Sequence, residues 1–200
     1  MKSLRAPPKP PPVTAAKVAR GIRSVRIIGG AWRSRLIQFP AVEGLRPTGD
    51  RVRETLFNWL GQDLAGKTCV DLFAGSGALG FEAASRGATR VLLCETGRAP
   101  LAALRAAKEL LQAAQIEVRQ VDALTLLHGN NVTEQFDIAF ADPPFAADLS
   151  ATVLAGAARL VKPRGWLYLE QPKMLEEVHP WRLFRHLKAG AVHAHLFQRE

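Results

Sequence analysis

The sequence has little cysteine and no long hydrophobic run, and both absences narrow the classes of protein to consider. Its 200 residues include two cysteines, Cys69 and Cys94, each inside an apolar segment and without the paired spacing of a metal site. We therefore expect buried free thiols and a reducing, cytoplasmic location. No apolar segment approaches the length of a membrane span. The run Pro7 to Pro12 lies where a signal peptide would need its apolar stretch.

Acidic residues are missing from one part of the chain. The first 39 residues contain nine of the 27 lysines and arginines and no aspartate or glutamate, whereas the remaining basic and acidic residues cancel. The formal net charge of +9 is therefore concentrated near the N-terminus, as expected for a basic arm that binds a polyanion. A solvated tail that only aids solubility is the alternative. We expect residues 1–20, which are rich in proline, lysine, arginine and alanine, to be disordered.

A small extension is expected over residues 21–64, between this arm and the main domain. Strand-forming residues on either side of Gly29 and Gly30 predict a hairpin. Apolar residues at helical spacing then predict a helix that begins near Thr48 or Asp50. Four arginines lie on or beside the predicted hairpin: Arg23, Arg26, Arg33 and Arg35.

From residue 65 onward, short apolar runs alternate with helical segments. The runs expected as strands begin at Thr68, Arg90, Ile116, Phe136 and Gly165. Two further strands, on either side of Gly190, are expected to close the chain. Alternation of this kind predicts parallel βαβ units in a doubly wound, Rossmann-like α/β sheet with a C-terminal antiparallel hairpin. We expect residues 65–200 to form this one domain.

A glycine-rich loop follows the first of these strands, in the segment Asp71-Leu-Phe-Ala-Gly-Ser-Gly-Ala-Leu-Gly. Its glycines at 75, 77 and 80 satisfy the spacing of a dinucleotide-binding loop that opens a helix. A pyrophosphate-binding loop gains from having no carboxylate just upstream, so Asp71 favours a zwitterionic ligand with an ammonium group. The glycines would also let a bulky sulfonium nucleoside approach the backbone. The loop thus favours S-adenosylmethionine over a nicotinamide dinucleotide, and a plain tight turn is the third interpretation.

Two further acidic residues end neighbouring strands. Glu95 closes the second strand, where it can accept hydrogen bonds from the ribose hydroxyls of either cofactor class. Asp122 ends the third strand, where methyltransferases of this architecture often hold the adenine amino group. An N-cap of the following helix is the competing interpretation of Asp122, because aspartate is favoured at that position.

The tetrapeptide Asp142-Pro-Pro-Phe decides between these chemistries. It follows an apolar run and so lies at the carboxyl end of the fourth strand, where open α/β sheets bind ligands. Asp142 and a main-chain carbonyl near Pro143 could accept both hydrogens of an aromatic amino group and direct its nitrogen at a sulfonium methyl group. The prolines would stiffen the loop, and Phe145 would stack on an extruded base. An ordinary proline turn is the alternative, but dehydrogenases have no use for this tetrapeptide.

These motifs, together with the segment from Gly44 to Leu60, closely resemble the RsmD family of bacterial methyltransferases. The segments that carry the resemblance are Arg26-Ile-Ile-Gly-Gly, Trp32-Arg, Gly44-Leu-Arg-Pro-Thr, Asp50-Arg-Val-Arg-Glu-Thr-Leu-Phe-Asn-Trp-Leu, the glycine loop and Asp142-Pro-Pro-Phe. The resemblance runs from about Arg23 to the C-terminal Leu196-Phe-Gln-Arg-Glu. It implies a class I methyltransferase fold with residues 65–200 as the catalytic domain. It also implies S-adenosylmethionine-dependent methylation of the N2 amino group of one guanine in 16S ribosomal RNA of the small ribosomal subunit.

The resemblance also implies roles for individual residues. Cofactor contacts would come from Asp71, Phe73, Gly75, Gly77, Glu95 and Asp122, with Thr48 and Arg51 near the amino-acid moiety. The target base would meet Asp142, Pro143, Pro144 and Phe145. RNA backbone contacts would come from Arg33, Arg35, Arg46 and Arg53. We expect a monomer and no metal.

Two positions depart from the family pattern, and two alternative functions remain. Gly97 stands where an acidic or polar residue is usual, and the helix around Ala107 lacks the common asparagine, so hydrogen bonding to the cofactor would be looser. One alternative is an amino-methyltransferase for adenine N6 or cytosine N4 in DNA or RNA, or for a protein glutamine. The other is a non-catalytic RNA-binding assembly factor, against which the intact Asp142 and glycine loop argue.

Overall fold

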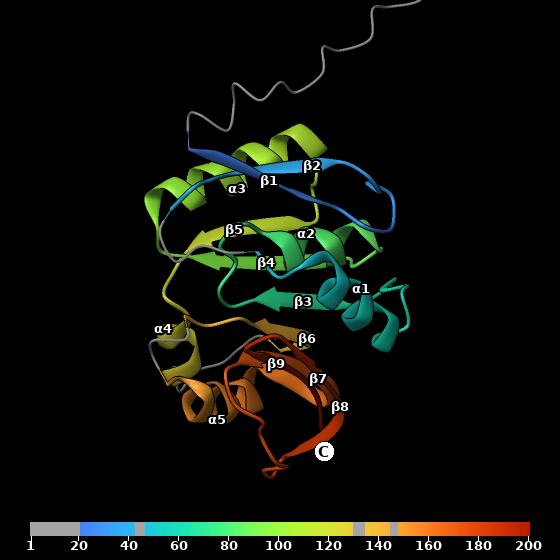
Figure 1. The fold of residues 1–200 in the computed structure, drawn as a ribbon, viewed down its shortest axis with the longest axis vertical. Coiled ribbons are helices and arrows are strands. Elements are labelled where there is room, and N and C mark those ends of the chain that lie inside the picture. The colour runs from blue at the N-terminus through green and yellow to red at the C-terminus, as the bar shows by residue number, and fades with distance from the viewer. Residues whose placement is uncertain (1–20, 43–46, 130–134, 145–147) are drawn as a thin grey trace, which may run out of the picture.

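A seven-stranded sheet runs through the computed structural model, which describes residues 21–42, 47–129, 135–144 and 148–200 (Figure 1). Its strands lie in the order β5-β4-β3-β6-β7-β9-β8. They comprise β3 (Thr68–Asp71), β4 (Arg90–Glu95), β5 (Ile116–Gln120), β6 (Phe136–Ala141), β7 (Val161–Gln171), β8 (Trp181–Ala189) and β9 (Val192–Arg199). Strands β3 to β7 are parallel, and β9 pairs antiparallel with both β7 and β8. The predicted doubly wound α/β fold with a C-terminal antiparallel hairpin is confirmed.

The central strands are apolar almost throughout because helices cover both faces of the sheet. In β4, the residues from Val91 to Cys94 are all at most 1% exposed. Both cysteines are buried, and burial raises the pKa of the Cys94 thiol to about 12. The expectation of buried free thiols is therefore confirmed for Cys69 and Cys94.

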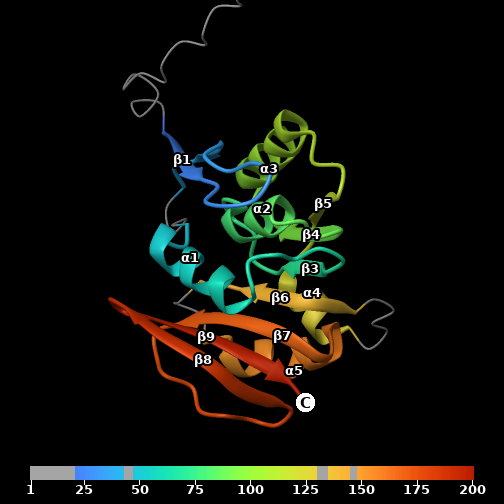
Figure 2. The ribbon, with the colours of Figure 1, turned by 90° about the vertical axis from the view of Figure 1, so that its right-hand side faces the viewer.

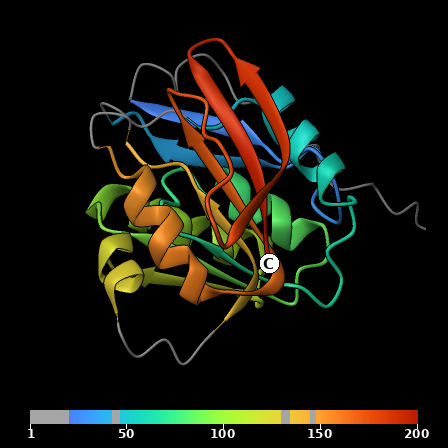
Figure 3. The same ribbon diagram turned by 90° about the horizontal axis from the view of Figure 1, so that it is seen from below.

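Within the described residues, five helices cover the two faces of the sheet. They are α1 (Asp50–Trp59), α2 (Ala78–Ser85), α3 (Arg98–Leu111), α4 (Ala123–His128) and α5 (Ser150–Leu160). Apolar side chains of α1, α2 and α3 form one core with Phe140 and Tyr168, and those of α4 and α5 form a second core with Leu167 and Leu169. Figure 3 shows α1 and α5 on opposite sides of the C-terminal strands. Among the described residues, no helix is both long and apolar enough to cross a membrane.

The strand order predicts where a ligand-binding site should lie. The chain leaves β3 in one direction to form β4 and β5, and it then returns to form β6 on the other side of β3. A ligand-binding crevice is expected where the order reverses, outside the carboxyl ends of the two central strands. The glycine loop follows β3 and Asp142 follows β6, so both motifs meet at this point.

The N-terminal extension packs onto the same core. Strands β1 (Ile22–Arg26) and β2 (Leu36–Pro40) form the predicted antiparallel hairpin, which lies beside α3 (Figure 1). Its inner residues share the core of α1 to α3. Gly30 has a φ of 75°, and a Cβ there would lie 1.9 Å from the main-chain oxygen of Ser85. Glycine is thus required where the hairpin turn meets the end of α2.

The predicted helix of the extension is α1, which Figure 2 shows between the hairpin and the sheet. Its N-cap is Gly49, which gives no side-chain cap, and its first residue is Asp50 as expected. The division of the chain at residues 64 and 65 stays a prediction. The arm, residues 1–20, lies outside the described residues.

Candidate active site

The glycine loop is braced from within by Asp71. Its carboxylate, 2% exposed, accepts a hydrogen bond from the Gly80 main-chain N–H at 3.1 Å. Gly77, with a φ of 79°, begins α2 without a side-chain cap, so Asp71 serves one of the unpaired N–H groups of the first turn. Burial raises the pKa of Asp71 to about 7. Asp71 therefore fixes α2 against β3, and the expected contact with a cofactor stays a prediction.

Glu95 joins two loops at the end of β4. One carboxylate oxygen accepts the Gly75 N–H at 2.9 Å, and the other accepts the N–H groups of Thr96 and Gly97 at 2.8 and 2.7 Å. A carboxylate has about four acceptor positions and three are used here, so Glu95 keeps about one for a ribose hydroxyl. Gly97 is the N-cap of α3, and its main-chain N–H is the group that donates to Glu95.

Asp122 caps α4. Its carboxylate accepts the Leu124 N–H at 2.9 Å, and the residue is exposed. The N-cap interpretation of Asp122 is thus confirmed. Adenine binding by this residue stays a prediction.

Asp142 lies directly after β6 and is partly buried. The Thr48 hydroxyl, only 7% exposed, donates to Asp142 Oδ2 at 3.5 Å. Burial, then the negative charges of Glu170 and Asp71, raise the pKa of Asp142 well above its usual range. Thr48 comes from the N-terminal extension, so the structure brings that extension to the predicted catalytic residue.

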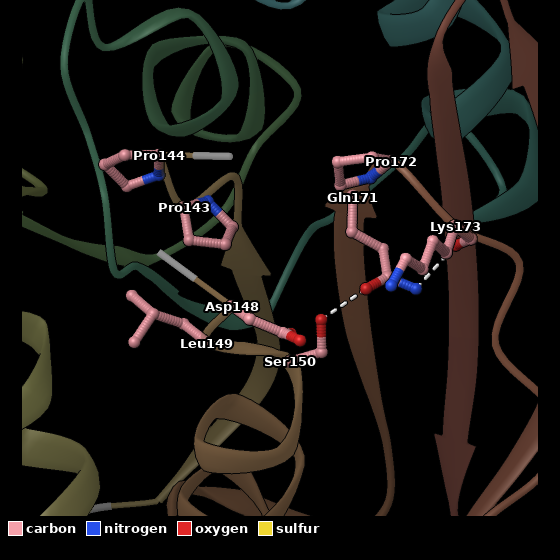
Figure 4. A pocket seen from close by; sticks show the side chains of 8 residues that line it. All are labelled: Pro143, Pro144, Asp148, Leu149, Ser150, Gln171, Pro172 and Lys173. Atoms are coloured by element: carbon pink, nitrogen blue, oxygen red, sulfur yellow. Dashed lines mark hydrogen bonds between the residues drawn. The ribbon is translucent and has the colours of Figure 1, made fainter. Parts of the chain in front are cut away.

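A pocket of about 120 Å³ opens beside the proline loop (Figure 4). Pro143 and Pro144 form one side, and Gln171 and Lys173 lie opposite, at the end of β7. The remaining lining residues are Asp148, Leu149, Ser150 and Pro172. The Ser150 hydroxyl donates to the Gln171 amide oxygen, and the Gln171 amide donates to the Lys173 carbonyl at 2.5 Å. The pocket therefore has one stiff apolar wall and one wall of fixed polar groups.

Arg53 was predicted to contact RNA, and the structure corrects this. Its side chain is 0% exposed and donates to four oxygens, two of them main-chain. Nε donates to the Thr48 carbonyl at 3.2 Å and Nη2 to the Arg26 carbonyl at 2.8 Å. Its salt bridges are to Asp50 at 2.6 Å and Glu82 at 3.1 Å. From the sequence alone, an arginine in a helix is predicted to lie on the surface. The partners that keep Arg53 buried come from three separate segments of the chain.

Glu82 is the centre of this network. Its buried carboxylate accepts the main-chain N–H groups of Ile28 and Gly29, each at 2.8 Å. It also forms salt bridges with Arg53 and with Arg86, the latter at 2.8 Å. A fully buried carboxylate is stable when it is paired and hydrogen-bonded in this way. Glu82 thus fastens the hairpin and α1 to α2.

The other predicted residues fall into three groups. Phe73 is partly buried and packs on the core of α4 and α5. Arg51, Arg33 and Arg35 are exposed, so they are accessible to a ligand or to RNA. Arg46 and Phe145 lie outside the described residues.

Glu170 and Tyr168 were not predicted as site residues. The Tyr168 hydroxyl donates to Glu170 Oε1 at 2.7 Å, and both side chains are at most 5% exposed. Burial raises the pKa of Glu170. A signal was available, because Glu170 ends the fifth predicted strand and Tyr168 lies two residues earlier, on the same face.

Three histidines cluster on the C-terminal hairpin. Ring nitrogens of His186, His193 and His195 lie within 4.8 Å of one another. His195 donates from Nδ1 to the Leu169 carbonyl at 3.3 Å and accepts the Leu175 N–H at Nε2, at 3.0 Å. Since both of its nitrogens are used, we assign the cluster a structural role in joining β8, β9 and the preceding loop.

Comparison with known proteins places the chain in a family. The family model described as "Conserved hypothetical protein 95" matches residues 25–198. The chain is 40% identical over 191 residues to the ribosomal RNA small subunit methyltransferase D of Escherichia coli, covering 90% of this chain and 92% of that one. It is 39% identical over 180 residues to the protein of the same name from Haemophilus influenzae, covering 87% and 93%. The chain belongs to the ribosomal RNA small subunit methyltransferase D family.

A solved structure agrees with this assignment. The structure of yhhF from Escherichia coli superposes with a TM-score of 0.79 at 39% identity, covering 89% of this chain and 99% of that one. The resemblance to the RsmD family, drawn from the motifs, is confirmed, and so is the class I methyltransferase fold. The family model, which matches residues 25–198, covers most of the extension as well as the α/β domain.

Proposed function

We propose that the protein transfers a methyl group from S-adenosylmethionine to the N2 amino group of a guanine in 16S ribosomal RNA. One observation carries the proposal: Asp142, on a loop stiffened by two prolines, lies where the strand order reverses, beside a glycine loop. A partly buried acceptor at this edge suits an amino group that must be oriented before it can react.

The residues around the glycine loop fit S-adenosylmethionine. Gly75 and Glu95 are partly exposed at the carboxyl edge, and Glu95 keeps about one acceptor position for a ribose hydroxyl. Thr48 hydrogen-bonds Asp142 at this edge, and Arg51 is exposed nearby in the sequence, which supports a place for them near the amino-acid moiety. When bound, S-adenosylmethionine supplies an electrophilic methyl group, whose bond to sulfur breaks as the bond to nitrogen forms.

The protein's own residues orient the base and take up its proton. Asp142 accepts a hydrogen bond from the amino group, which holds the nitrogen lone pair toward the methyl group. A carboxylate with a raised pKa is also a better proton acceptor at neutral pH, and the methylated nitrogen must lose one proton. Pro143, which is buried, fixes the loop in this position.

The pocket beside the proline loop supports guanine as the base. Asp148 offers an acceptor and Lys173 a donor, both exposed. With its reacting amino group at Asp142, guanine would still offer an N1–H donor and an O6 acceptor, whereas adenine would offer only the N1 acceptor. Reading a flipped base by hydrogen bonds to this edge is the usual means of base selection. The pocket therefore complements guanine better than adenine.

A ribosomal RNA substrate is supported by the relatives and by charge. The relatives from Escherichia coli and Haemophilus influenzae are named as small subunit ribosomal RNA methyltransferases. Arg23, Arg26, Arg33 and Arg35 are exposed on and beside the hairpin, as phosphate contacts require. A chain of this size has little surface for reading a long sequence, which favours a shaped site on the small subunit over naked RNA. The flipped base should come from a loop or bulge.

Nucleoside analysis tests the reaction. The protein and labelled cofactor are incubated with naked 16S RNA and with small subunits from a strain that lacks this enzyme, and the RNA is digested to nucleosides. We expect label in N2-methylguanine and more of it from subunits. Label in N6-methyladenine or N4-methylcytosine would overturn the base assignment, and modification of naked RNA alone would overturn the particle preference.

Variants of Asp142 test the site. Asp142→Ala should lower methyl transfer by about 100-fold or more, with Asp142→Asn milder because its amide oxygen still accepts one hydrogen bond. Cofactor affinity should stay within a few-fold of the wild type, and calorimetry should detect S-adenosylmethionine binding but not NAD at comparable concentration. Wild-type turnover by Asp142→Ala, or tight binding of NAD alone, contradicts the proposal.

A further inference from the structure

Thr48 reaches the proposed catalytic carboxylate from the N-terminal extension, and the contact is a long one. Its hydroxyl donates to Asp142 Oδ2 at 3.5 Å, whereas an O–H···O hydrogen bond is usually about 2.7–2.8 Å long. At this length, a small movement of Thr48 decides whether the bond forms. The orientation of the Asp142 carboxylate therefore depends on how firmly the extension holds Thr48.

The turn that carries Thr48 has no side-chain cap. Gly49 is the N-cap of α1, and it offers no side chain to the first turn of the helix. A bond to this turn comes instead from Arg53, whose Nε donates to the Thr48 carbonyl at 3.2 Å. Long side chains of a helix point back toward its N-terminus, so Arg53 can reach a residue five positions earlier. A side chain of α1 thus holds the segment that leads into α1.

Arg53 is itself fixed by oxygens from other segments. Its Nη2 donates to the Arg26 carbonyl at 2.8 Å and to the Asp50 carboxylate, and its Nη1 donates to Glu82 at 3.1 Å. The guanidinium is planar and its donors point in fixed directions, so these bonds also set the direction of Nε. Because Arg26 ends β1 and Glu82 lies in α2, the hairpin and α2 together position the group that holds Thr48.

We propose that Arg53 is a positioning residue for methyl transfer, which holds the Thr48 hydroxyl against Asp142 and so orients the carboxylate toward the amino group of the base. This role rests on the proposed function. Arg53 is fully buried, so it acts through Thr48 and needs no contact with substrate or cofactor. A residue that acts in this way should change the rate of the bound complex and leave the affinity for RNA nearly constant.

Arg53→Lys tests this role, because it keeps the buried positive charge and removes the fork of donors. Single-turnover methyl transfer to small subunits is measured at saturating cofactor, at a temperature where circular dichroism shows the variant to be folded. The maximal rate should fall about 10-fold or more, the scale of a small misplacement of a catalytic group. The concentration of small subunits that gives half of this rate should stay within about 2-fold of the wild-type value.

Two control variants separate positioning from a general loss of stability. Asp50→Asn alters a largely exposed partner of Arg53 and keeps the bond from Arg53 to the Thr48 carbonyl. Leu160→Ala opens a cavity in the core of α4 and α5, away from this network. Both variants should methylate small subunits at the wild-type maximal rate.

The pH dependence of the rate gives a second readout. The ionisable groups that face Asp142 are Glu170 and Tyr168 from β7 and Asp71 from β3, with Arg53 behind Thr48. Arg53→Lys changes the charge of none of them. The hydrogen bond from Thr48 favours the charged carboxylate and lowers the pKa of Asp142, so loss of this bond raises that pKa. The acid limb of the rate should therefore move to higher pH by about half a unit, the size of a weak hydrogen bond.

A double-mutant cycle shows whether Arg53 acts through Thr48. Thr48→Val removes the hydroxyl at constant size and should slow transfer about 10-fold, with the same shift of the acid limb and with rescue by Thr48→Ser. Arg53→Lys added to Thr48→Val should slow transfer by less than about 2-fold more, because the hydroxyl that Arg53 holds is already gone.

Three results would overturn the positioning role: a wild-type rate in Arg53→Lys, an acid limb that does not move, or two losses of rate that multiply in the double variant. If Arg53→Lys does not fold, Arg53→Gln combined with Glu82→Gln takes its place, since it removes both charges of the buried pair, and the same slowing is expected. A wild-type enzyme that methylates no RNA instead overturns the proposed function, so the two failures are distinguishable.

Discussion

Removal of the Glu82 carboxylate should release the N-terminal extension from the sheet. Glu82 is 0% exposed and accepts four hydrogen bonds, from Ile28, Gly29, Arg53 and Arg86. In Glu82→Ala, both main-chain N–H groups lose their acceptor, and the buried Arg53 keeps only one charged partner, Asp50. The change therefore affects the hairpin, α1 and α2 at once.

The size of the loss in stability follows from the kind of group that Glu82→Ala removes. Breaking a buried ion pair by removing one partner costs about 3–5 kcal/mol. Each orphaned N–H adds up to about 1–3 kcal/mol where water cannot reach it. Because these terms overlap, we expect the free energy of unfolding to fall by at least about 3 kcal/mol. A domain of this kind has about 5–15 kcal/mol in total, so the variant should fold but be much weaker.

Urea and thermal unfolding measure this loss. Glu82→Ala should lower the melting temperature by about 10 °C, and Glu82→Gln, which keeps one acceptor oxygen, should lose about half as much. Glu109→Ala on α3 is the control, because Glu109 is exposed and should change stability by less than about 0.5 kcal/mol. If Glu82→Ala unfolds within 0.5 kcal/mol of the wild type, roughly the size of a surface substitution, the network does not hold the extension.

Two further predictions concern charge. Deletion of residues 1–20 removes five basic residues, Lys2, Arg5, Lys9, Lys17 and Arg20. RNA binding should therefore weaken and its salt dependence should flatten, while cofactor affinity stays constant. An unaltered slope of RNA affinity against salt concentration would show that the arm does not contact RNA. Burial raises the pKa of Asp71 to about 7, so the folded state holds a proton that the unfolded state releases from about pH 4. The contribution of Asp71 to the free energy of unfolding is present below about pH 4 and is lost as the pH rises to about 7, by up to about 4 kcal/mol. Asp71→Asn cannot titrate, so its free energy of unfolding should fall less over this pH range. Equal pH profiles of stability for the two proteins would contradict this.

Most of the fold could be predicted because its signals are local. The run Val91 to Cys94 is apolar throughout because β4 is covered on both faces, and the glycine loop marks the junction of β3 and α2. The resemblance to a family then supplied the proposed function. The N-cap role of Asp122 could also be read locally, since the capped N–H belongs to Leu124, two residues away.

The remaining site residues depend on contacts between segments far apart in the sequence. Arg53 reads as a surface arginine because its partners Arg26 and Glu82 lie 27 and 29 residues away. Glu170 acquires its place beside Asp142 only through the register of two strands separated by α5. The strand-end position of Glu170 was a local signal, but no local pattern shows its place beside Asp142 or the burial of Arg53, so both of these needed the folded structure.

Gly80 packs closely against strand β4, and a double-mutant cycle can measure the energy of this contact. A Cβ on Gly80 would lie 2.1 Å from Leu93 Cδ2 and 3.4 Å from Asp71 Oδ2. Gly80→Ala must therefore displace Leu93 or move α2 away from β4, and overpacking of this kind costs about 1–3 kcal/mol.

Shortening the opposing side chain should relieve the clash. Leu93→Ala alone opens a cavity in a fully buried position and should cost about 2–5 kcal/mol. In Gly80→Ala with Leu93→Ala, the new methyl group occupies part of that cavity, so the double variant should be more stable than the sum of the single losses predicts, by about 1 kcal/mol or more. Additive losses would mean that α2 does not rest on Leu93, and the third glycine of the loop would then be needed for another reason than close packing of helix on strand.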